Sequence, residues 1–364
     1  MRMQKTLMSG NDAVAEAAIQ AGCKFYYGYP ITPQSEISEY MARRMPEVGG
    51  TFIQSESEVA AINMVLGTSA GGARAMTSSS GLGITLKQEG ICFLAACELP
   101  GVIVNMMRGG PGLGNIGPGQ SDYIQATRGG GHGDYHTIVL GPASVQEMAD
   151  LTFLTFDLAD KYRNPAMLLC DGIMAQMMEP IEICRKEIIE LPPKTWALTG
   201  CKDRKPNVIR SLFLEEGALE RHNVGLQEKY RRIQEDECRY ERVEAEDAEL
   251  VLVAYGISSR LCRAAMVPLL KEGYKIGLFR PISLWPFPSE ALNAITTSRT
   301  TVLVVEMSFG QMVDDVRLAL SGKCDVRFFG RGGGEMMTVE QVLAGIRKTI
   351  QDKRIEPAAL KECV

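Results

Sequence analysis

The sequence contains none of the closely spaced cysteine pairs that hold zinc ions and iron–sulfur clusters. Ten cysteines are spread over 364 residues, and the two nearest to each other, Cys92 and Cys97, are too far apart for a C-x-x-C motif. That motif is the usual signature of zinc and iron–sulfur ligation. We therefore expect this chain by itself to hold neither a metal ion nor an iron–sulfur cluster.

Long hydrophobic runs and a large excess of one charge are also missing. No stretch approaches the roughly 20 apolar residues that span a bilayer. The N-terminal segment has no apolar core with a small-residue cleavage site. The formal net charge is only -5. We therefore expect a cytoplasmic protein with neither a membrane nor nucleic acid among its partners.

What the sequence does contain is a regular alternation of short β-rich runs and helical patterns. In the first half this alternation runs from a helix expected at Asp12 to a strand expected at 165–171. Strands separated by helices of ten or more residues predict a parallel sheet that is covered by helices on both faces. The first fold prediction is therefore a doubly wound α/β domain.

A densely charged segment divides the chain. It includes the block "EKYRRIQEDECRYERVEAED" at 228–247, which has the composition of a solvated helix with many ion pairs. Strand and helix patterns resume with "AELVLVAYG" at 248–256. We therefore predict an α/β domain over 1–185, a charged linker or insert over 186–247, and a second α/β domain over 248–364.

A glycine-rich loop over 108–120 follows the apolar run "GVIVNMM" and has the spacing of a dinucleotide-binding fingerprint, Gly112-x-Gly114-x-x-Gly117. In that fingerprint the later glycines open a helix, but here Pro118 and Gly119 follow at once. The acidic residue expected at the end of the next strand is also absent. A nicotinamide-dependent Rossmann dehydrogenase is therefore disfavoured, whereas a surface loop and a loop that closes over a ligand both fit.

Thr32 and Arg108 are candidates for binding an anion. Thr32 precedes Pro33, which is the pattern of a helix N-cap followed by proline at the first helical position. Helix N-termini at the carboxyl ends of parallel strands also bind anions, so the Thr32 hydroxyl could meet a carboxylate. Arg108 follows a predicted strand, where it could clamp a carboxylate or lie on the surface.

Glu58 is the candidate for proton chemistry. Ser55 and Glu58 have the spacing of a capping box, which would give Glu58 a purely structural role. The alternative is a carboxylate that is shielded from water and shares a proton with a ring nitrogen, for which Glu56 competes. The pattern alone leaves both interpretations open.

Seven segments considered together are more specific than any single motif. They are "GYPITPQSE" (28–36), 54–81, 107–123, "GGGHGD" (129–134), "LLCDGIM" (168–174), "RPISLWPFP" (280–288) and "GRGGG" (330–334). In this order they resemble the α subunit of the 2-oxoacid:ferredoxin oxidoreductases, with most likeness to the branched-chain, 2-oxoisovalerate or VorB-type, subunit. The resemblance covers most of the chain outside the charged segment.

The resemblance implies a thiamine-diphosphate-binding domain of the pyrimidine type, followed by an α/β domain of the transketolase C-terminal type. The implied reaction is oxidative decarboxylation of a 2-oxoacid with coenzyme A, which gives an acyl-CoA, carbon dioxide and reduced ferredoxin. Thiamine diphosphate would be shared with a β subunit that carries the diphosphate and magnesium site. Iron–sulfur clusters would lie on partner subunits, γ and a ferredoxin-like δ, in a dimer of heteromers.

The resemblance also implies roles for individual residues. Glu58 matches the glutamate that hydrogen-bonds the pyrimidine ring nitrogen of the cofactor and drives its imino tautomer. Thr32 matches a residue that contacts the oxoacid end of the substrate, and Arg108 matches the arginine that pairs with the substrate carboxylate. Tyr29 and Pro30 belong to the same motif as Thr32 and are expected at the cofactor.

Within the glycine loop the sequence departs from its 2-oxoglutarate-type relatives. Those subunits tend to read Arg-Gly-Gly-Pro-Ser-Thr-Gly, whereas here Gly109 and Gly110 are followed by Pro and then by Gly112, Leu113 and Gly114. An apolar side chain in place of hydroxyls would favour an apolar substrate side chain over a second carboxylate. We therefore expect a branched-chain 2-oxoacid as substrate, with 2-oxoglutarate, pyruvate or a non-catalytic assembly role as alternatives.

Overall fold

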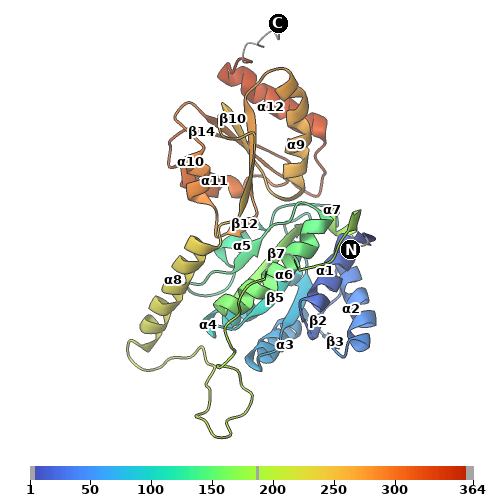
Figure 1. The fold of residues 1–364 in the computed structure, drawn as a ribbon, viewed down its shortest axis with the longest axis vertical. Helices are drawn as coiled ribbons and strands as arrows, with labels where there is room; N and C mark the ends of the chain where they lie inside the picture. Colours follow the sequence, from blue (N-terminus) through green and yellow to red (C-terminus); the bar gives the residue numbers. More distant parts are fainter. Residues whose placement is uncertain (1–4, 186–187, 358–364) are drawn as a thin grey trace.

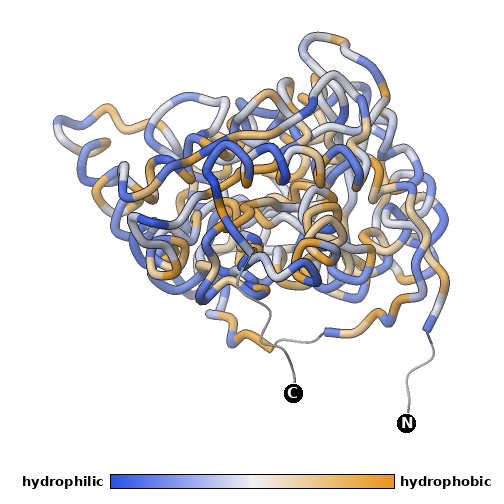
Figure 2. The backbone as a smooth tube through the Cα atoms, turned by 90° about the horizontal axis from the view of Figure 1, so that it is seen from above, coloured by the Kyte–Doolittle hydropathy of each residue, from blue (hydrophilic) through white to orange (hydrophobic). Residues whose placement is uncertain are grey.

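The computed structural model describes residues 5–185 and 188–357. Within them, two sheets with their helices form two lobes, one above the other in Figure 1. In Figure 2 many outer turns are hydrophilic, whereas hydrophobic stretches gather toward the interior. This distribution is the one expected when each sheet is buried under helices.

The first sheet is the lower one in Figure 1 and has the strand order β12-β6-β7-β5-β4-β2-β3. Its strands are β2 (Phe25–Gly28), β3 (Thr51–Gln54), β4 (Ala75–Ser79), β5 (Gly101–Met107), β6 (Ile138–Leu140), β7 (Pro165–Asp171) and β12 (Ser283–Trp285). All neighbours are parallel except β12, which runs antiparallel to β6. Strands β4, β5 and β7 are buried along their whole length, as expected for a sheet covered on both faces.

The helices of this lobe pack in two groups, α1 with α2 and α6, and α3 with α4. They are α1 (Gly10–Gln20), α2 (Ser35–Glu47), α3 (Glu58–Ala70), α4 (Leu82–Ala96), α5 (Tyr123–Arg128), α6 (Val145–Tyr162) and α7 (Gly172–Gln176). A two-stranded antiparallel ribbon of β1 (Thr6–Ser9) and β8 (Met178–Ile181) completes the lobe.

The second sheet has the order β14-β13-β10-β11-β9 and is parallel except for β9. Its strands are β9 (Tyr240–Val243), β10 (Leu250–Val253), β11 (Ile276–Pro281), β13 (Thr301–Glu306) and β14 (Asp325–Gly330). The helices after residue 188 are α8 (Ala218–Asp236), α9 (Gly256–Lys271), α10 (Ser289–Ala294), α11 (Met312–Leu320) and α12 (Val339–Lys353).

The charged segment is less uniform than predicted. The expectation of one solvated helix over 228–247 is wrong in its second half, because α8 ends at Asp236 and 240–243 forms β9 at the edge of the second sheet. There β9 pairs with the backbone groups of β11 that would otherwise be left unpaired along the edge of the sheet. The division at residues 185 and 247 stays a prediction.

The second half of the chain also reaches into the first lobe. Strand β12 joins the edge of the first sheet, although it comes from the sequence motif "RPISLWPFP". Just before it, Arg280 of β11 donates two hydrogen bonds of 2.8 Å to the carboxylate of Glu147 on α6. Such a paired arginine–carboxylate contact fixes direction as well as distance. The two lobes are therefore tied together by main-chain and side-chain bonds.

A buried polar network around Gln120 forms the centre of the junction. The Gln120 amide oxygen accepts hydrogen bonds from the Met307 backbone amide at 2.8 Å and from the Ser258 hydroxyl at 2.9 Å. Its side-chain nitrogen donates to the Tyr255 carbonyl at 3.0 Å. Gln120 is fully buried and cannot bond to water. These hydrogen bonds within the protein therefore satisfy its amide group.

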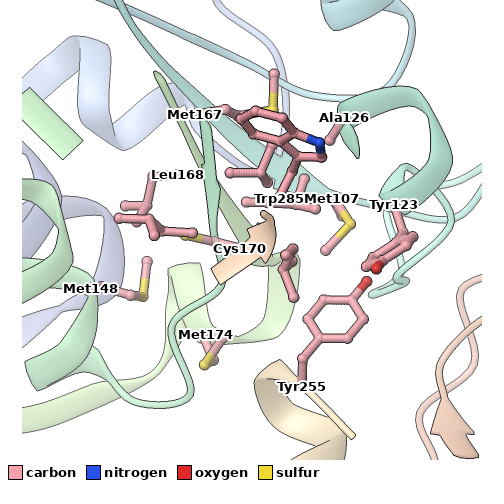
Figure 3. Close-up of a cluster of buried hydrophobic side chains, with 14 of the residues drawn as sticks. Met107, Tyr123, Ala126, Met148, Met167, Leu168, Cys170, Met174, Tyr255 and Trp285 are labelled. Atoms are coloured by element: carbon pink, nitrogen blue, oxygen red, sulfur yellow. The ribbon is translucent and has the colours of Figure 1, made fainter. Parts of the chain in front are cut away.

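A cluster of buried apolar side chains includes Tyr255, whose carbonyl accepts the bond from Gln120 (Figure 3). Tyr123 of α5 and Tyr255 before α9 lie ring to ring, with centroids 5.6 Å apart. The other labelled members of the cluster are Met107, Ala126, Met148, Met167, Leu168, Cys170, Met174 and Trp285. Since the cluster draws residues from both halves of the chain, its burial stabilises the junction as well as each lobe.

Asp171 gives the junction a pH dependence. Its carboxylate lies at the start of α9 and accepts a hydrogen bond of 2.6 Å from the Ile257 amide. Burial raises the pKa of Asp171 from 3.8 to about 7, against the opposing effect of that bond. The stability gained from a neutral Asp171 is complete below pH 3.8, falls as the pH rises and is gone above about 7.

We predict that the unfolding free energy of the wild type falls relative to that of Asp171→Asn as the pH rises from 4 to 7. The difference between the two proteins should change by up to about 4 kcal/mol. Denaturant unfolding at several pH values measures this difference. Asp203→Asn makes the same substitution at an exposed position and is the control. A wild-type minus Asp171→Asn difference that does not vary with pH would contradict the prediction.

Candidate active site

The candidate site lies where neighbouring strands of the first sheet end. Strands β2, β4 and β5 are adjacent and parallel, so their carboxyl ends share one edge. The loops that follow them carry Thr32, Ser80 and Arg108 respectively, and Glu58 opens α3 after β3. This edge is the usual ligand-binding position in open α/β sheets.

Arg108 is held at this edge by two backbone carbonyl groups. It is 8% exposed, and its guanidinium donates to the carbonyl oxygen of Thr32 at 3.0 Å and of Leu113 at 3.2 Å. Among the residues that the structure describes, no carboxylate forms an ion pair with it. The structure therefore brings Thr32 and Arg108 together and leaves the arginine's charge available to an anion.

The expectation that Thr32 caps a helix is wrong. Helix α2 begins at Ser35 with Gln34 as its N-cap, and Gln34 donates its backbone amide to the carbonyl of Ile31. Thr32 and Pro33 therefore lie in a turn before the helix. The Thr32 side chain is exposed, so its hydroxyl is accessible to a ligand.

Tyr29 and Pro30 lie on the same connection from β2 to α2. Both are exposed, and the Tyr29 carbonyl accepts a hydrogen bond of 3.1 Å from the side chain of Gln34. Of the motif "YPITP", Tyr29, Pro30 and Thr32 are exposed, whereas the last residue, Pro33, is buried. The hydrogen bond from Gln34 fixes the backbone of this turn.

The proposed capping box of Ser55 and Glu58 is also wrong. Ser57 is the N-cap of α3, and its hydroxyl accepts from the Ala60 amide at 3.2 Å. Glu58 is 6% exposed, whereas Glu56 is exposed and accepts a bond from the Ser57 hydroxyl. The cap is two residues later than expected, which leaves Glu58 without a capping role and makes it the shielded carboxylate of the two.

The Glu58 carboxylate lies against Gly83 and Ser79. A methyl group on Gly83 would be 2.7 Å from Glu58 Oε1 and would also collide with Ser79 Oγ. Within the described residues, no group donates a hydrogen bond to this carboxylate, and the buried hydroxyls of Ser79 and Ser80 have no partner either. Buried polar groups without partners are uncommon, and here they fit the ring nitrogen and amino group of an aminopyrimidine.

The glycine loop after Arg108 folds back on itself instead of opening a helix. The Gly109 amide donates to the Gly117 carbonyl at 2.8 Å, and Gly112 and Gly114 have φ angles of 67° and 59°. Helix α5 begins only at Tyr123. The loop therefore does not direct helix amides at a pyrophosphate, which agrees with the sequence argument against a dinucleotide site.

The tip of this loop is also tied to the second lobe. Asn115 donates its backbone amide to the Gly109 carbonyl at 3.0 Å and its side-chain amide to Gly333 at 2.9 Å. Gly333 belongs to the segment "GRGGG". Side chains on Gly117 or Gly334 would collide with this contact, which explains glycine on both sides of it.

Lys87 is a site residue that the sequence argument missed. It is completely buried on α4, and its ammonium donates to the Glu58 carbonyl oxygen at 3.4 Å. Burial lowers the pKa of Lys87 to about 8, while the charge of Glu58 opposes this shift. The only signal in the sequence is the spacing of four residues from Gly83, which places both on one face of the helix.

The described part of the chain contains no group of three or more histidine, cysteine or acidic side chains that could hold a metal ion. None of its helices combines the length and the hydrophobicity of a membrane-spanning segment.

Two family models match the chain. One, described as "Pyruvate flavodoxin/ferredoxin oxidoreductase, thiamine diP-bdg", covers residues 16–247. The other, "Pyruvate:ferredoxin oxidoreductase core domain II", covers residues 248–342. The fold and these matches define a thiamine-diphosphate-binding α/β protein.

Similar proteins agree with this class. The ketoisovalerate oxidoreductase subunit VorB of Methanothermobacter thermautotrophicus is 51% identical over 350 residues, which are 96% of this chain and 99% of VorB. The 2-oxoglutarate synthase subunit KorA of Methanocaldococcus jannaschii is 36% identical, covering 93% of this chain and 98% of KorA. The chain belongs to the 2-oxoacid:ferredoxin oxidoreductase family and is a subunit of a multisubunit enzyme.

A solved structure supports the same assignment. The 2-oxoglutarate:ferredoxin oxidoreductase from Magnetococcus marinus, with 2-oxoglutarate, coenzyme A and succinyl-CoA bound, matches with a TM-score of 0.80 and 28% identity. The match covers 96% of this chain and 66% of that chain. The predicted fold class and the family resemblance are confirmed.

Gly83→Ala tests the geometry around Glu58. Because the colliding atoms belong to flexible side chains, we expect the chain to fold but the Glu58 carboxylate to move. Thiamine diphosphate affinity of the assembled complex, measured by titration calorimetry, should fall at least about 10-fold, the cost of roughly 1.4 kcal/mol. The control is Gly67→Ala on α3, where no atom lies within 4 Å of the added methyl; unchanged affinity in both variants would refute the geometry.

Proposed function

We propose that this chain is the α subunit of an oxidoreductase that converts a branched-chain 2-oxoacid, 2-oxoisovalerate first among them, with coenzyme A into an acyl-CoA and carbon dioxide. The electrons pass to ferredoxin. The observation that carries the proposal concerns one sheet edge, where the described residues provide neither a hydrogen-bond donor for the buried Glu58 carboxylate nor an ion-pair partner for Arg108.

Glu58 would hold the pyrimidine ring of thiamine diphosphate. When bound, this cofactor supplies the nucleophilic carbon and the electron sink for decarboxylation. The Glu58 carboxylate is placed to accept a hydrogen bond from the ring nitrogen, and burial strengthens that bond because water is excluded. The hydroxyls of Ser79 and Ser80 are the nearby groups still able to bind the ring, and Tyr29 and Pro30 would flank it.

Arg108 and Thr32 would bind the substrate. The guanidinium can donate two parallel hydrogen bonds to the 2-oxoacid carboxylate, and the exposed Thr32 hydroxyl can donate to its oxo group. The loop that contains Gly109, Gly110, Gly112 and Gly114 would close beside this carboxylate, since its Leu113 carbonyl already contacts Arg108.

The side chain of Leu113 supports the choice of a branched-chain substrate. It is 77% exposed and lies on the residue whose carbonyl holds Arg108, so it presents an apolar surface next to the carboxylate site. A second substrate carboxylate would gain no partner from it. Two relatives with 51% identity are named for ketoisovalerate, whereas relatives named for 2-oxoglutarate are less similar, at 36% to 39% identity.

The remaining parts of the reaction would come from partner chains. Here Cys170-Asp171-Gly172 replaces the Gly-Asp-Gly motif of a diphosphate site, so a β subunit would supply the diphosphate and Mg²⁺ site. Iron–sulfur clusters would lie on γ and ferredoxin-like δ subunits, because this sequence has no C-x-x-C pair. Coenzyme A would be the cosubstrate, and the assembly a dimer of heteromers in the cytoplasm.

Substrate profiling tests this assignment. The complex of this chain with its native partners should reduce ferredoxin with a higher kcat/KM for 2-oxoisovalerate than for 2-oxoglutarate or pyruvate. Arg108→Met should raise KM for 2-oxoisovalerate by roughly 10-fold to 100-fold, because a charge-assisted hydrogen bond is worth about 1.5–3 kcal/mol.

Arg299→Met, at an exposed position in the second lobe, is the matched control and should leave KM unchanged. A preference for 2-oxoglutarate would overturn the branched-chain assignment. An unchanged KM in Arg108→Met would overturn the role of Arg108.

A further inference from the structure

Lys87 is a completely buried cationic side chain next to the site. It is 0% exposed, and within 5–185 and 188–357 its ammonium makes one hydrogen bond, of 3.4 Å, to the Glu58 carbonyl. An ammonium has three donors, and burying it without a counter-charge is strongly unfavourable. An apolar residue of similar length would fill the same space without this penalty. The lysine therefore needs an explanation beyond packing.

The helix geometry directs Lys87 at Glu58. Gly83 and Lys87 are four residues apart on α4 and share a face, and a side chain there leans toward the helix N-terminus. That face looks into α3, because a methyl on Gly83 would touch the Glu58 carboxylate and one on Gly90 would touch Ile62. Lys87 lies between these two contacts, inside the seam that positions Glu58.

The ammonium is close to Glu58 without occupying its carboxylate. Lys87 bonds the main-chain oxygen, and among the described residues no ion pair joins its ammonium to the Glu58 carboxylate. The carboxylate thus keeps its oxygens free for a ligand while a buried positive charge lies nearby. In a site of low dielectric such a charge acts strongly on a neighbouring carboxylate.

We propose that Lys87 is a positioning residue that acts through Glu58: its ammonium bonds the main chain at the first turn of α3 and so fixes the Glu58 carboxylate in the pocket that receives the pyrimidine ring. This inference rests on the cofactor role proposed for Glu58. Lys87 itself would touch neither the ring nor the substrate.

The test uses Lys87→Met in the complex reconstituted with its partner subunits and thiamine diphosphate. Methionine keeps the length and the burial but removes the charge. We expect kcat to fall about 10-fold, which corresponds to roughly 1.4 kcal/mol of lost transition-state stabilisation, with KM for the 2-oxoacid unchanged. The near-ultraviolet circular dichroism of the bound aminopyrimidine should change as well, a signal that a loss of stability alone would not produce.

Lys229→Met is the matched control. Lys229 on α8 is also buried, and burial likewise lowers its pKa to about 8, but it bonds Glu98 and the Arg163 carbonyl away from Glu58. The Lys229→Met variant should have a lower free energy of unfolding but an unchanged circular dichroism spectrum of the bound cofactor. If Lys87→Met matches wild type in kcat and in spectrum, the proposal is overturned.

A double-variant cycle separates the two proposals. If Lys87 acts through Glu58, Lys87→Met should add nothing to the defect of Glu58→Gln. A normal Glu58→Gln complex would overturn the role of Glu58 itself, whereas a defective Glu58→Gln with a normal Lys87→Met would overturn only the inference. Lys87→Gln is the second variant, and failure of both Lys87 variants to fold would show a purely structural lysine and overturn the proposal.

Discussion

The close approach of α3 and α4 is the constraint on which the candidate site depends. Gly83 and Gly90 lie on one face of α4, and any side chain there would collide with Glu58 or Ile62. Because the helices meet so closely, Glu58 is buried, and none of the residues that the structure describes donates a hydrogen bond to its carboxylate. Such an arrangement costs stability, and proteins retain it where a ligand supplies the missing partner.

The glycine loop connects this site to the junction between the lobes. It begins at Arg108, is bonded through Asn115 to Gly333 of the second lobe, and ends at the buried Gln120 network. The second lobe therefore acts on the site indirectly, by fixing the far side and the end of the loop that carries Leu113. The position of the glycine loop at the candidate site therefore depends on residues that are distant in the sequence, such as Gly333 and Met307.

The sequence predicted the features that depend on local pattern. Alternating strands and helices indicated the parallel sheet, and the place of Arg108 after an apolar strand put it at the carboxyl edge, because both follow from burial. The predictions of helix caps at Thr32 and Ser55 are wrong, because the N-cap of α2 is Gln34 and that of α3 is Ser57. Local cap patterns are common, and tertiary contacts choose among them.

Other features could not be predicted because they join distant segments. Strand β12 crosses to the first sheet, and β9 arises within a segment whose charge is typical of a solvated helix. Lys87 carries no motif, and only its burial against Glu58 makes it notable. The resemblance supplied the role of Glu58, and the structure added the reason that Glu58 rather than Glu56 is shielded.

The central claim is that Glu58 of this chain accepts a hydrogen bond from thiamine diphosphate that is bound by a partner subunit. Exchange of the thiazolium C2 proton for deuterium, followed by nuclear magnetic resonance after acid quench, measures that contribution before any substrate reacts. We predict fast exchange in the wild-type complex and a rate at least about 100-fold lower with Glu58→Gln, the usual scale of a lost acid–base partner, while Glu56→Gln remains fast. Equal exchange in the wild-type and Glu58→Gln complexes would contradict the account and favour a non-catalytic assembly subunit.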